Sequence, residues 1–167
     1  MTCNVLVTGG AGYIGCHVVK DLLNSNAHNV IVFDNLSSGY ADLVQSAKLI
    51  VGDIRNSDLL YNVLIQEKIT AVMHLAAKTS VPESIENPEL YYDNNTMGTL
   101  SLLSACKKAQ IPHFIFSSTA AVYGLPKESS VQENSPTEPI NPYGHSKLMS
   151  EHMIQDFANA YNMKFVI

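Results

Sequence analysis

The sequence predicts an α/β fold with a doubly wound parallel sheet, and two observations carry this prediction. Short β-branched and aromatic runs alternate with helical stretches from one end of the chain to the other. The apolar positions within each run are consecutive rather than alternating, which is typical of parallel strands buried on both faces. Strands are expected at residues 5–7, 30–33, 49–51, 71–73, 114–116 and 165–167, and helices at 13–24, 57–66, 143–161 and in a longer stretch ending near 110.

Composition and charge describe one ordinary soluble domain. The chain has 167 residues, of which 46% are hydrophobic and 15% charged, and this is enough apolar mass for a single core. The net charge of -5 and the lack of a basic block argue against nucleic-acid binding, which needs clustered Lys and Arg. No apolar run approaches the length of a membrane span, so we expect no membrane partner.

Cysteine and histidine usage predicts neither a disulfide nor a metal site. Cys3, Cys16 and Cys106 are scattered, odd in number and not preceded by a signal peptide, which is typical of reduced thiols in a cytoplasmic protein. His17 and His74 lack a metal-like arrangement, and we expect packing or capping roles for both.

Two long connections and the end of the chain bear on domain organisation. Residues 79–88 and 124–142 are expected to be loops, and loops of that length in a compact domain tend to be functional. The last expected strand has nothing after it. We therefore expect residues 1–167 to form one domain that stops inside its architecture.

A Gly-rich turn at residues 8–15, Thr-Gly-Gly-Ala-Gly-Tyr-Ile-Gly, follows the first strand and opens the first helix. Gly9 permits the tight turn, Gly12 lets the backbone approach a diphosphate, and Gly15 lets helix and strand pack closely. The free N–H groups and the helix dipole then favour an anion. Asp34 closes the second strand 19 residues after Gly15, where a carboxylate would accept hydrogen bonds from ribose hydroxyls.

These features together predict a Rossmann-type dinucleotide-binding domain with NAD as its cofactor. The alternative is that the Gly-rich turn is purely structural and that Asp34 is only a capping residue. This alternative explains less of the sequence, because it does not account for the combination of strand, turn, helix and acidic strand end. A carboxylate at Asp34 would repel the 2′-phosphate of NADP, and no Arg stands near it to reverse that preference.

A second motif, Tyr143-Gly-His-Ser-Lys147, places a phenol and an amine on one face at the start of a helix. A phenol is a poor base at neutral pH, but a nearby ammonium stabilises the phenolate, which can then take a proton from a substrate hydroxyl. Ser117, Ser118 and Thr119 leave the fifth strand at its carboxyl end, and any of them could bridge the substrate and the phenol. The alternatives are an exposed helical pair and a Ser/Thr strand end bonded to its own backbone.

These motifs, in their order along the chain, resemble the extended short-chain dehydrogenase/reductase family, and most closely its UDP-sugar 4-epimerases. The resemblance covers all 167 residues. Besides the Gly-rich turn and the Tyr-Lys motif, it rests on Phe-Asp-Asn at 33–35, Gly-Asp-Ile-Arg-Asn at 52–56, His-Leu-Ala-Ala at 74–77, Tyr-Tyr-Asp-Asn-Asn-Thr-Met-Gly-Thr at 91–99 and the Ser/Thr segment at 116–124.

The resemblance implies a role for each matching residue. Thr119 would be the catalytic Ser/Thr, Tyr143 the base and Lys147 its partner. The cofactor contacts that it implies are Gly9, Gly12, Tyr13, Ile14 and Gly15 at the diphosphate, Asp34 and Asn35 at the adenosine ribose, Asp53 and Ile54 at adenine, Leu75, Ala76 and Ala77 beneath the cofactor, and Asn94, Ser117, Tyr143 and Lys147 beside it.

The activity that the resemblance implies is NAD-dependent epimerisation at C4 of a nucleotide sugar, UDP-glucose or UDP-galactose, through a 4-keto intermediate. It also implies a C-terminal substrate-binding portion that is absent from these residues. A homodimer is implied as well, formed by the apolar faces of two long helices. Those faces carry Leu102, Leu103, Cys106 and Ala109 on one helix and Met149, Met153 and Phe157 on the other.

One departure and several alternatives qualify this hypothesis. The family often has Gly-Leu-Lys-Ala-Val-Gly-Glu-Ser after the fourth strand, whereas residues 77–84 read Ala-Lys-Thr-Ser-Val-Pro-Glu-Ser, so we assign Lys78 no role. A 4,6-dehydratase needs an acid beside Thr119, where Ala120 and Ala121 stand. A decarboxylase, a UDP-N-acetylhexosamine epimerase and a non-catalytic NAD-binding fragment remain open beside the dehydratase.

Overall fold

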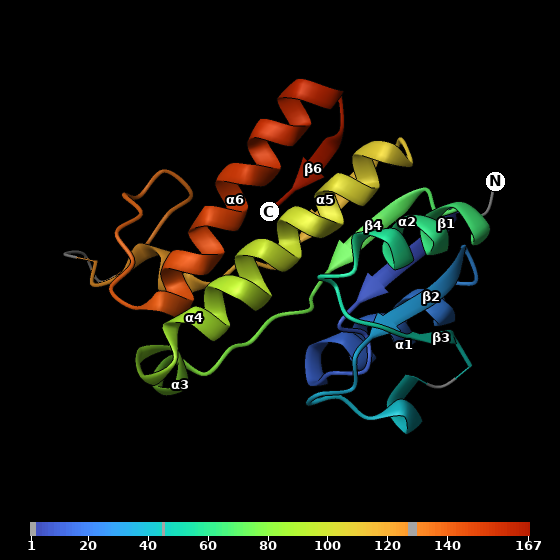
Figure 1. Cartoon of the computed structure of the whole chain (residues 1–167), viewed down its shortest axis with the longest axis horizontal. Coiled ribbons are helices and arrows are strands. Elements are labelled where there is room, and N and C mark those ends of the chain that lie inside the picture. Colours follow the sequence, from blue (N-terminus) through green and yellow to red (C-terminus); the bar gives the residue numbers. More distant parts are fainter. Residues whose placement is uncertain (1–2, 45, 127–129) are drawn as a thin grey trace.

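The computed structural model describes residues 3–44, 46–126 and 130–167, and it confirms the predicted α/β architecture. Within the described residues, one parallel sheet runs in the order β3-β2-β1-β4-β5-β6 (Figure 1). Its strands are β1 (Cys3–Thr8), β2 (His28–Asp34), β3 (Lys48–Val51), β4 (Ala71–His74), β5 (His113–Phe116) and β6 (Lys164–Val166). The chain order reverses between β1 and β4, and this leaves a crevice at their carboxyl ends.

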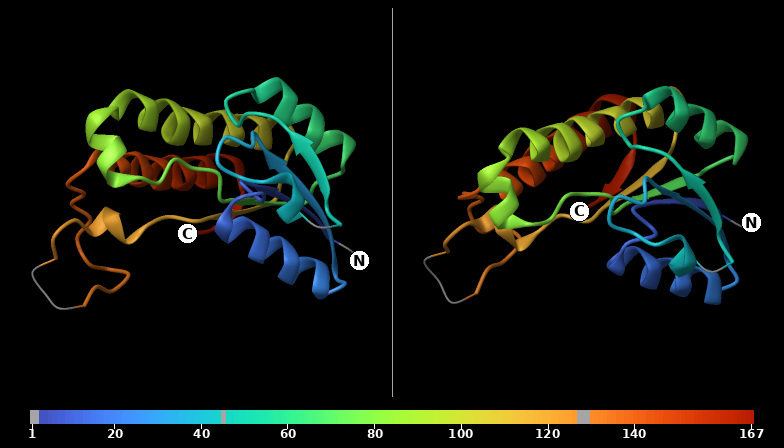
Figure 2. Two further views of the ribbon diagram at one scale, coloured as in Figure 1. Left: turned by 90° about the horizontal axis from the view of Figure 1, so that it is seen from below. Right: turned by 60° about the horizontal axis from the view of Figure 1, so that its bottom comes forward.

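Each face of the sheet carries its own apolar core, because side chains alternate along a strand. Val5 and Val7 of β1 belong to one core and Leu6 to the other. The larger core lies under α2 (Ser57–Gln66), α5 (Gly98–Lys108) and α6 (Pro142–Tyr161), whereas α1 (Tyr13–Asn24) covers the opposite face (Figure 2). Burial on both faces explains why the strand residues are apolar at consecutive positions.

Local sequence sets the ends of the helices that carry the site. Asn141 precedes α6, and its side chain accepts a hydrogen bond from the Gly144 N–H at 2.8 Å. Pro142 occupies the first position, where its missing N–H has no cost. Asn162 ends the helix in the left-handed conformation, with φ of 54°.

The prediction of a loop over residues 79–88 is wrong. This segment contains α3 (Val81–Glu86), and α4 (Pro88–Tyr91) begins at its end. The side chain of Ser80 accepts a hydrogen bond from the Glu83 N–H, and Pro82 stands in the first turn. Ser-x-x-Glu with an early proline is a helix-start pattern, and it outweighs the expectation drawn from loop length.

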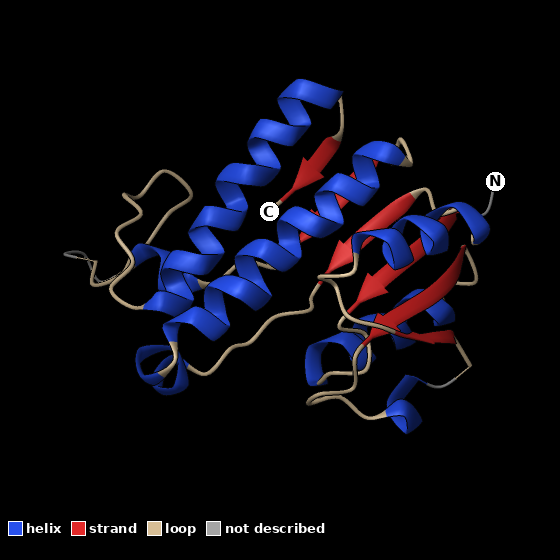
Figure 3. Ribbon diagram, viewed as in Figure 1, coloured by secondary structure: helices blue, strands red, loops and turns tan. Residues whose placement is uncertain are grey.

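The long helix expected to end near residue 110 is divided into three parts. After α4 the backbone widens into a π-helical segment, η2 (Tyr92–Met97), and then continues as α5. The second predicted loop follows a short 3₁₀ turn, η3 (Ala120–Tyr123), and forms no helix or strand in its described residues, 124–126 and 130–141 (Figure 3). A further 3₁₀ turn, η1 (Ala41–Val44), lies between β2 and β3.

No helix among the described residues is both long and apolar enough to cross a bilayer.

Candidate active site

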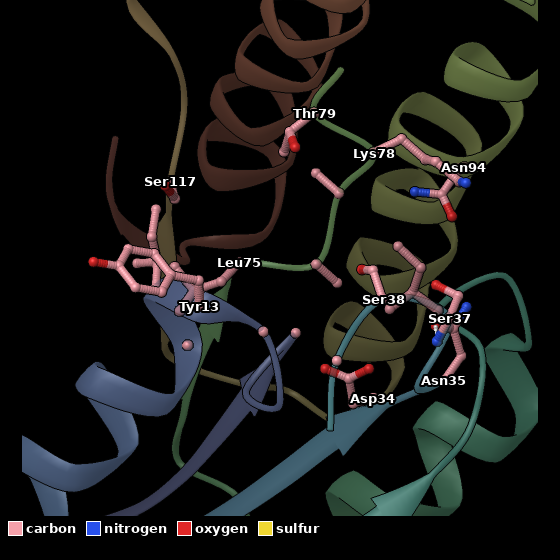
Figure 4. A pocket seen from close by; sticks show the side chains of 18 of the residues that line it. Tyr13, Asp34, Asn35, Ser37, Ser38, Leu75, Lys78, Thr79, Asn94 and Ser117 are labelled. Carbon is pink, nitrogen blue, oxygen red and sulfur yellow. Dashed lines mark hydrogen bonds between the residues drawn. The ribbon is translucent and has the colours of Figure 1, made fainter. Parts of the chain in front are cut away.

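A cavity of about 580 Å³ opens at the carboxyl ends of the strands, in the crevice that the strand order predicts. Figure 4 shows Asp34, Asn35, Ser37 and Ser38 grouped at one end, and Ser117 with Tyr13 at the other. The sequence-predicted residues that line it are Gly9, Gly12, Tyr13, Ile14, Gly15, Asp34, Asn35, Ile54, Leu75, Ala76, Ala77, Asn94, Ser117, Ser118, Tyr143 and Lys147. Asp53 and Thr119 are not among the lining residues.

Backbone contacts fix the Gly-rich turn against the rest of the cavity. Gly9 has a φ of +74°, and a Cβ there would come within 2.6 Å of the Ala76 nitrogen. A Cβ at Gly15 would lie only 2.1 Å from the Gly9 carbonyl oxygen. Both positions therefore require glycine, because the backbone segments touch.

The N-terminus of α1 faces the cavity with its backbone donors free of side-chain caps. Its cap residue, Gly12, makes no side-chain hydrogen bond, and no acidic residue lies in the first turn. Tyr13 and Ile14 are exposed at the same place. An uncapped N-terminus at a cavity favours a bound anion, since orphan N–H groups and the helix dipole both attract negative charge.

Asp34 combines the two roles that the sequence left open. Its carboxylate accepts a hydrogen bond from the Ala11 N–H at 3.0 Å and another from the Leu36 N–H at 2.8 Å. The residue therefore shapes the turn, as a capping Asp would. It also lines the cavity, and each carboxylate oxygen retains a further acceptor site for a ligand hydroxyl.

Asp53 is directed to a neighbour rather than to the cavity. Arg55 donates to both of its carboxylate oxygens, at 2.8 and 2.7 Å, and Asn35 donates to one of them. The Arg55 side chain holds the pKa of this carboxyl well below its usual range. Arg55 also pairs with Asp93 on η2. The neighbouring Ile54 lines the cavity instead.

Lys147 lies in an unusual environment for a charged amine. The residue is 3% exposed, and its Nζ stands 4.0 Å from the centre of the Phe116 ring. Burial lowers the pKa of Lys147 to about 7, while Glu151, one turn further along α6, opposes the shift. The amine therefore titrates near neutral pH, beside a cavity that Tyr143 also lines.

The structure distinguishes the hydroxyl groups that follow β5. Ser118 donates its single proton to Glu151, so that proton is already committed. The Thr119 oxygen accepts from the Ala121 N–H at 3.1 Å and caps η3, an arrangement that leaves the Thr119 proton for another acceptor. Ser117 and Ser118 both line the cavity, whereas Thr119 does not.

Sequence reasoning missed a polar group on α3 and α4. The buried Tyr91 donates to Glu83 at 2.7 Å, and its ring meets Tyr143 edge-on with centroids 6.3 Å apart. Burial and the Glu83 carboxylate raise the pKa of Tyr91 to about 12. Glu83 and Lys78 line the cavity, with Lys78 Nζ 4.0 Å from a Glu83 oxygen. The helix-start pattern at Ser80 was the signal that could have found them.

Fold and site together define a dinucleotide-binding domain with a Tyr-Lys pair at its cleft. A family model described as GDP-mannose 4,6 dehydratase matches residues 6–167, and the chain belongs to this family. UDP-glucose 4-epimerase of Azospirillum brasilense is 48% identical over 98% of this chain and 47% of its own length. That of Lactobacillus helveticus is 45% identical over 96% of this chain and 49% of its own.

Solved structures agree with these relatives. UDP-glucose 4-epimerase from Brucella ovis in complex with NAD matches with a TM-score of 0.95 and 42% identity, over 98% of this chain and 50% of that one. The UDP-Glc/GlcNAc 4-epimerase from Campylobacter jejuni matches with a TM-score of 0.94 and 40% identity, over 98% and 51%. The resemblance drawn from the motifs is confirmed, and the chain spans about half the length of the curated relatives it matches.

Proposed function

We propose that this chain is the NAD-binding half of a UDP-sugar 4-epimerase that interconverts UDP-glucose and UDP-galactose, with its substrate-binding half outside the 167 residues. One observation carries the proposal. Tyr143 and Lys147 line the same cavity as the Gly-rich turn and Asp34, so an acid–base pair and a dinucleotide-binding turn share one cleft. The 4-epimerases named among the relatives and neighbours support the choice of reaction.

The residues of the cleft fit NAD. The uncapped start of α1 suits a diphosphate, and Asp34 suits a ribose diol but would repel a 2′-phosphate. Leu75, Ala76 and Ala77 provide an apolar floor. NAD, when bound, supplies the acceptor and donor of the hydride that the sugar C4 gives up and regains.

The remaining steps fall to this chain's own side chains. The Tyr143 phenolate takes the proton of the sugar 4-hydroxyl, and the Lys147 ammonium stabilises that phenolate. The uncommitted proton of Thr119 is donated to the substrate oxygen, which requires that its side chain turn toward the cleft. When the other face of the 4-keto sugar is reduced, Tyr143 returns the proton to the oxygen.

A second candidate is dehydration, because the matching family model is described as a 4,6 dehydratase. Loss of water needs a proton donor beside Thr119, and Ala120 and Ala121 cannot provide one. Substrate range is a separate question, since the Campylobacter jejuni neighbour is described as acting on both UDP-Glc and UDP-GlcNAc. We propose the non-acetylated sugars as substrates and test the acetylated ones alongside.

We also propose that the whole enzyme is a homodimer in which α5 and α6 contribute the interface. The structure leaves fewer residues for this interface than the sequence suggested, because Leu102, Leu103 and Cys106 are buried in the chain's own core. Met97 just before α5, and Met149 and Tyr161 on α6, are exposed hydrophobic residues that could contribute. Sedimentation of the whole enzyme as a monomer at high concentration would rule the dimer out.

Two measurements test the proposal. Calorimetric titration of the 167-residue chain should show NAD binding at least tenfold tighter than NADP binding. For turnover, we would fuse residues 1–167 to the C-terminal half of the Azospirillum brasilense enzyme and assay UDP-galactose, both UDP-N-acetylhexosamines and the formation of a 4-keto-6-deoxy product. UDP-galactose should be epimerised, whereas deoxy product alone would identify a dehydratase.

The role of Tyr143 is tested in the same fusion protein. Tyr143→Phe should lower the turnover rate by about 10²–10⁴-fold, the usual contribution of a general base, and leave NAD bound. Tyr161→Phe removes a hydroxyl from the far, exposed end of the same helix and should change neither property. Full turnover with Tyr143→Phe would show that another group is the base.

A further inference from the structure

Five buried polar side chains lie behind the cavity and have no part in the proposed chemistry. They are Thr8 on β1, His74 on β4, Asn95 on η2, Thr99 on α5 and Ser146 on α6, and we refer to them as the buried polar chain. Each is at most 2% exposed, and none lines the cavity. Burying a polar group costs free energy unless its hydrogen bonds are made, so each of these side chains needs partners inside the protein.

We propose that the buried polar chain is a strut of fixed hydrogen-bond direction, which sets the Tyr143–Lys147 helix against the floor of the cavity. His74 acts in it as a neutral ring protonated at Nε2, and Asn95 acts as the positioning residue that joins floor and helix. The inference rests on the proposed function in one respect only, because one of its tests measures NAD affinity.

Thr99 fixes the direction. Its hydroxyl has one proton and lies 2.6 Å from the Asn95 carbonyl oxygen, which can only accept, so the proton points there. The Thr99 oxygen is also 3.0 Å from His74 Nε2, and this nitrogen must therefore be the donor. A neutral ring protonated at Nε2 has a bare Nδ1, which accepts from the Thr8 hydroxyl at 2.7 Å.

The surroundings keep the ring neutral. His74 is 1% exposed and packs against the Phe114 and Phe116 rings, with centroids 6.1 and 5.5 Å away. The Lys147 amine lies over Phe116, so a second positive charge on His74 would be repelled. Burial, reinforced by Lys147, lowers the pKa of His74 to about 3. The ring is therefore expected to be neutral near pH 7, which is the form that the direction of the strut requires.

Asn95 satisfies both ends of its amide on different parts of the site. Its oxygen accepts from the Lys78 N–H at 2.8 Å, and its nitrogen donates to the Lys78 carbonyl at 3.0 Å. The same nitrogen donates to Ser146 at 3.0 Å, and Ser146 donates to the Tyr143 carbonyl at 2.7 Å. One side chain thus holds the peptide that follows the Leu75–Ala77 floor and the first turn of α6.

The π-helical segment carries two adjacent asparagines, and the Asn94 nitrogen donates a hydrogen bond to the Asn95 side-chain oxygen at 2.9 Å. Asn94 lines the cavity, whereas its neighbour Asn95 is buried and bonded to Lys78 and Ser146. The Asn95 carbonyl lies in this widened turn and accepts the Thr99 hydroxyl. Single wide turns of this kind recur at functional sites, and here the turn connects the strut to the cleft.

Nuclear magnetic resonance on the 167-residue wild-type chain tests the direction. Long-range ¹H–¹⁵N spectra should show His74 as the Nε2–H form from pH 5 to 9, without titration. The Nδ1–H form, or a ring that titrates in this range, would overturn the proposal. This measurement needs neither a variant nor NAD, so it stands or falls separately from the proposed cofactor.

Variants test the positioning role. Asn95→Ala should weaken NAD binding at least tenfold and speed amide exchange at Lys78 at least tenfold. Val63→Ala, in the core under α2, provides a comparably destabilised control and should leave both quantities within twofold. If Asn95→Ala also stays within twofold, or Val63→Ala shifts as much, the residue is only structural.

A conservative pair covers the case in which Asn95→Ala does not fold. Thr99→Ser keeps the hydroxyl and should retain NAD affinity within about threefold, whereas Thr99→Val removes it and should lose at least fivefold. Equal affinities for these two variants would overturn the proposal. If wild-type chain does not bind NAD at all, the proposed cofactor fails, while the His74 tautomer and the Lys78 exchange rate still decide the strut.

Discussion

The two ends of the cleft are built in different ways. At the end formed by the Gly-rich turn and Asp34, each contact involves a backbone atom on at least one side. These contacts come from β1, α1 and β2, which adjoin in sequence, and from Ala76 after β4, which lies against Gly9. At the end formed by Tyr143 and Lys147, the contacts are side-chain hydrogen bonds between elements as distant as β1 and α6. The first end is rigid by backbone geometry, whereas the second depends on every member of a buried network.

The largest expected effect comes from a substitution in the Gly-rich turn, at the first end of the cleft. Gly15→Ala places a Cβ 2.1 Å from the Gly9 carbonyl oxygen, so the helix or the turn must move. We expect a loss of about 3 kcal/mol or more in unfolding free energy and loss of NAD binding, measured by urea denaturation and calorimetry. Gly12→Ala is the matched control for the stability measurement, because its Cβ would meet the Gly9 oxygen at 3.4 Å, an ordinary contact. Equal destabilisation by the two would contradict the backbone argument.

A smaller effect concerns the buried cation at the second end. The pKa of Lys147 is about 7 in the folded chain against an ordinary value of 10.5, so between these values the unfolded chain binds more protons. Wild-type stability should therefore rise with pH through this window, and the burial penalty is full below about pH 7. Lys147→Met should stabilise the chain by roughly 2 kcal/mol or more at pH 6.

Urea denaturation of both proteins from pH 6 to 9 measures this difference. The stability advantage of Lys147→Met over the wild type should shrink as pH rises. Groups that titrate equally in both proteins, such as Cys106, whose thiol pKa burial raises, cancel in this difference. An advantage that stays constant over this range would mean that Lys147 does not titrate near pH 7.

The smallest expected effect concerns the Arg55–Asp53 pair, which lies beside the first end of the cleft. Arg55→Gln releases the Asp53 carboxylate from a pair whose Arg side chain is 43% exposed, and solvent screens such pairs. We expect a stability loss below about 1 kcal/mol and a change in NAD affinity of about twofold or less. Lys48→Gln, which breaks the exposed pair with Glu67, is the control for loss of a surface charge. A tenfold weaker NAD affinity for Arg55→Gln alone would show that Asp53 must be held for the cofactor.

Much of the first end could be predicted from the sequence, because its motifs are local. The spacing of Gly9, Gly12 and Gly15 after an apolar strand indicates one backbone path, and Asp34 is placed beside it by the next strand. Asp53 was harder, because its carboxylate is directed by Arg55 and Asn35 rather than by its own strand. The position of Thr119 was equally hard to predict, because its side chain caps η3 and does not line the cavity.

The sequence by itself determined the α/β fold, the position of the Gly-rich turn and the Tyr143–Lys147 pair on one helical face. These follow from periodicity, glycine positions and short spacings, which are properties of adjacent residues. Only the tertiary structure decided that Lys147 is buried against Phe116, that Tyr91 packs edge-on against Tyr143, and that His74 lies between Thr8 and Thr99. Burial and hydrogen-bond partners depend on elements far apart in the chain, so no local pattern specifies them.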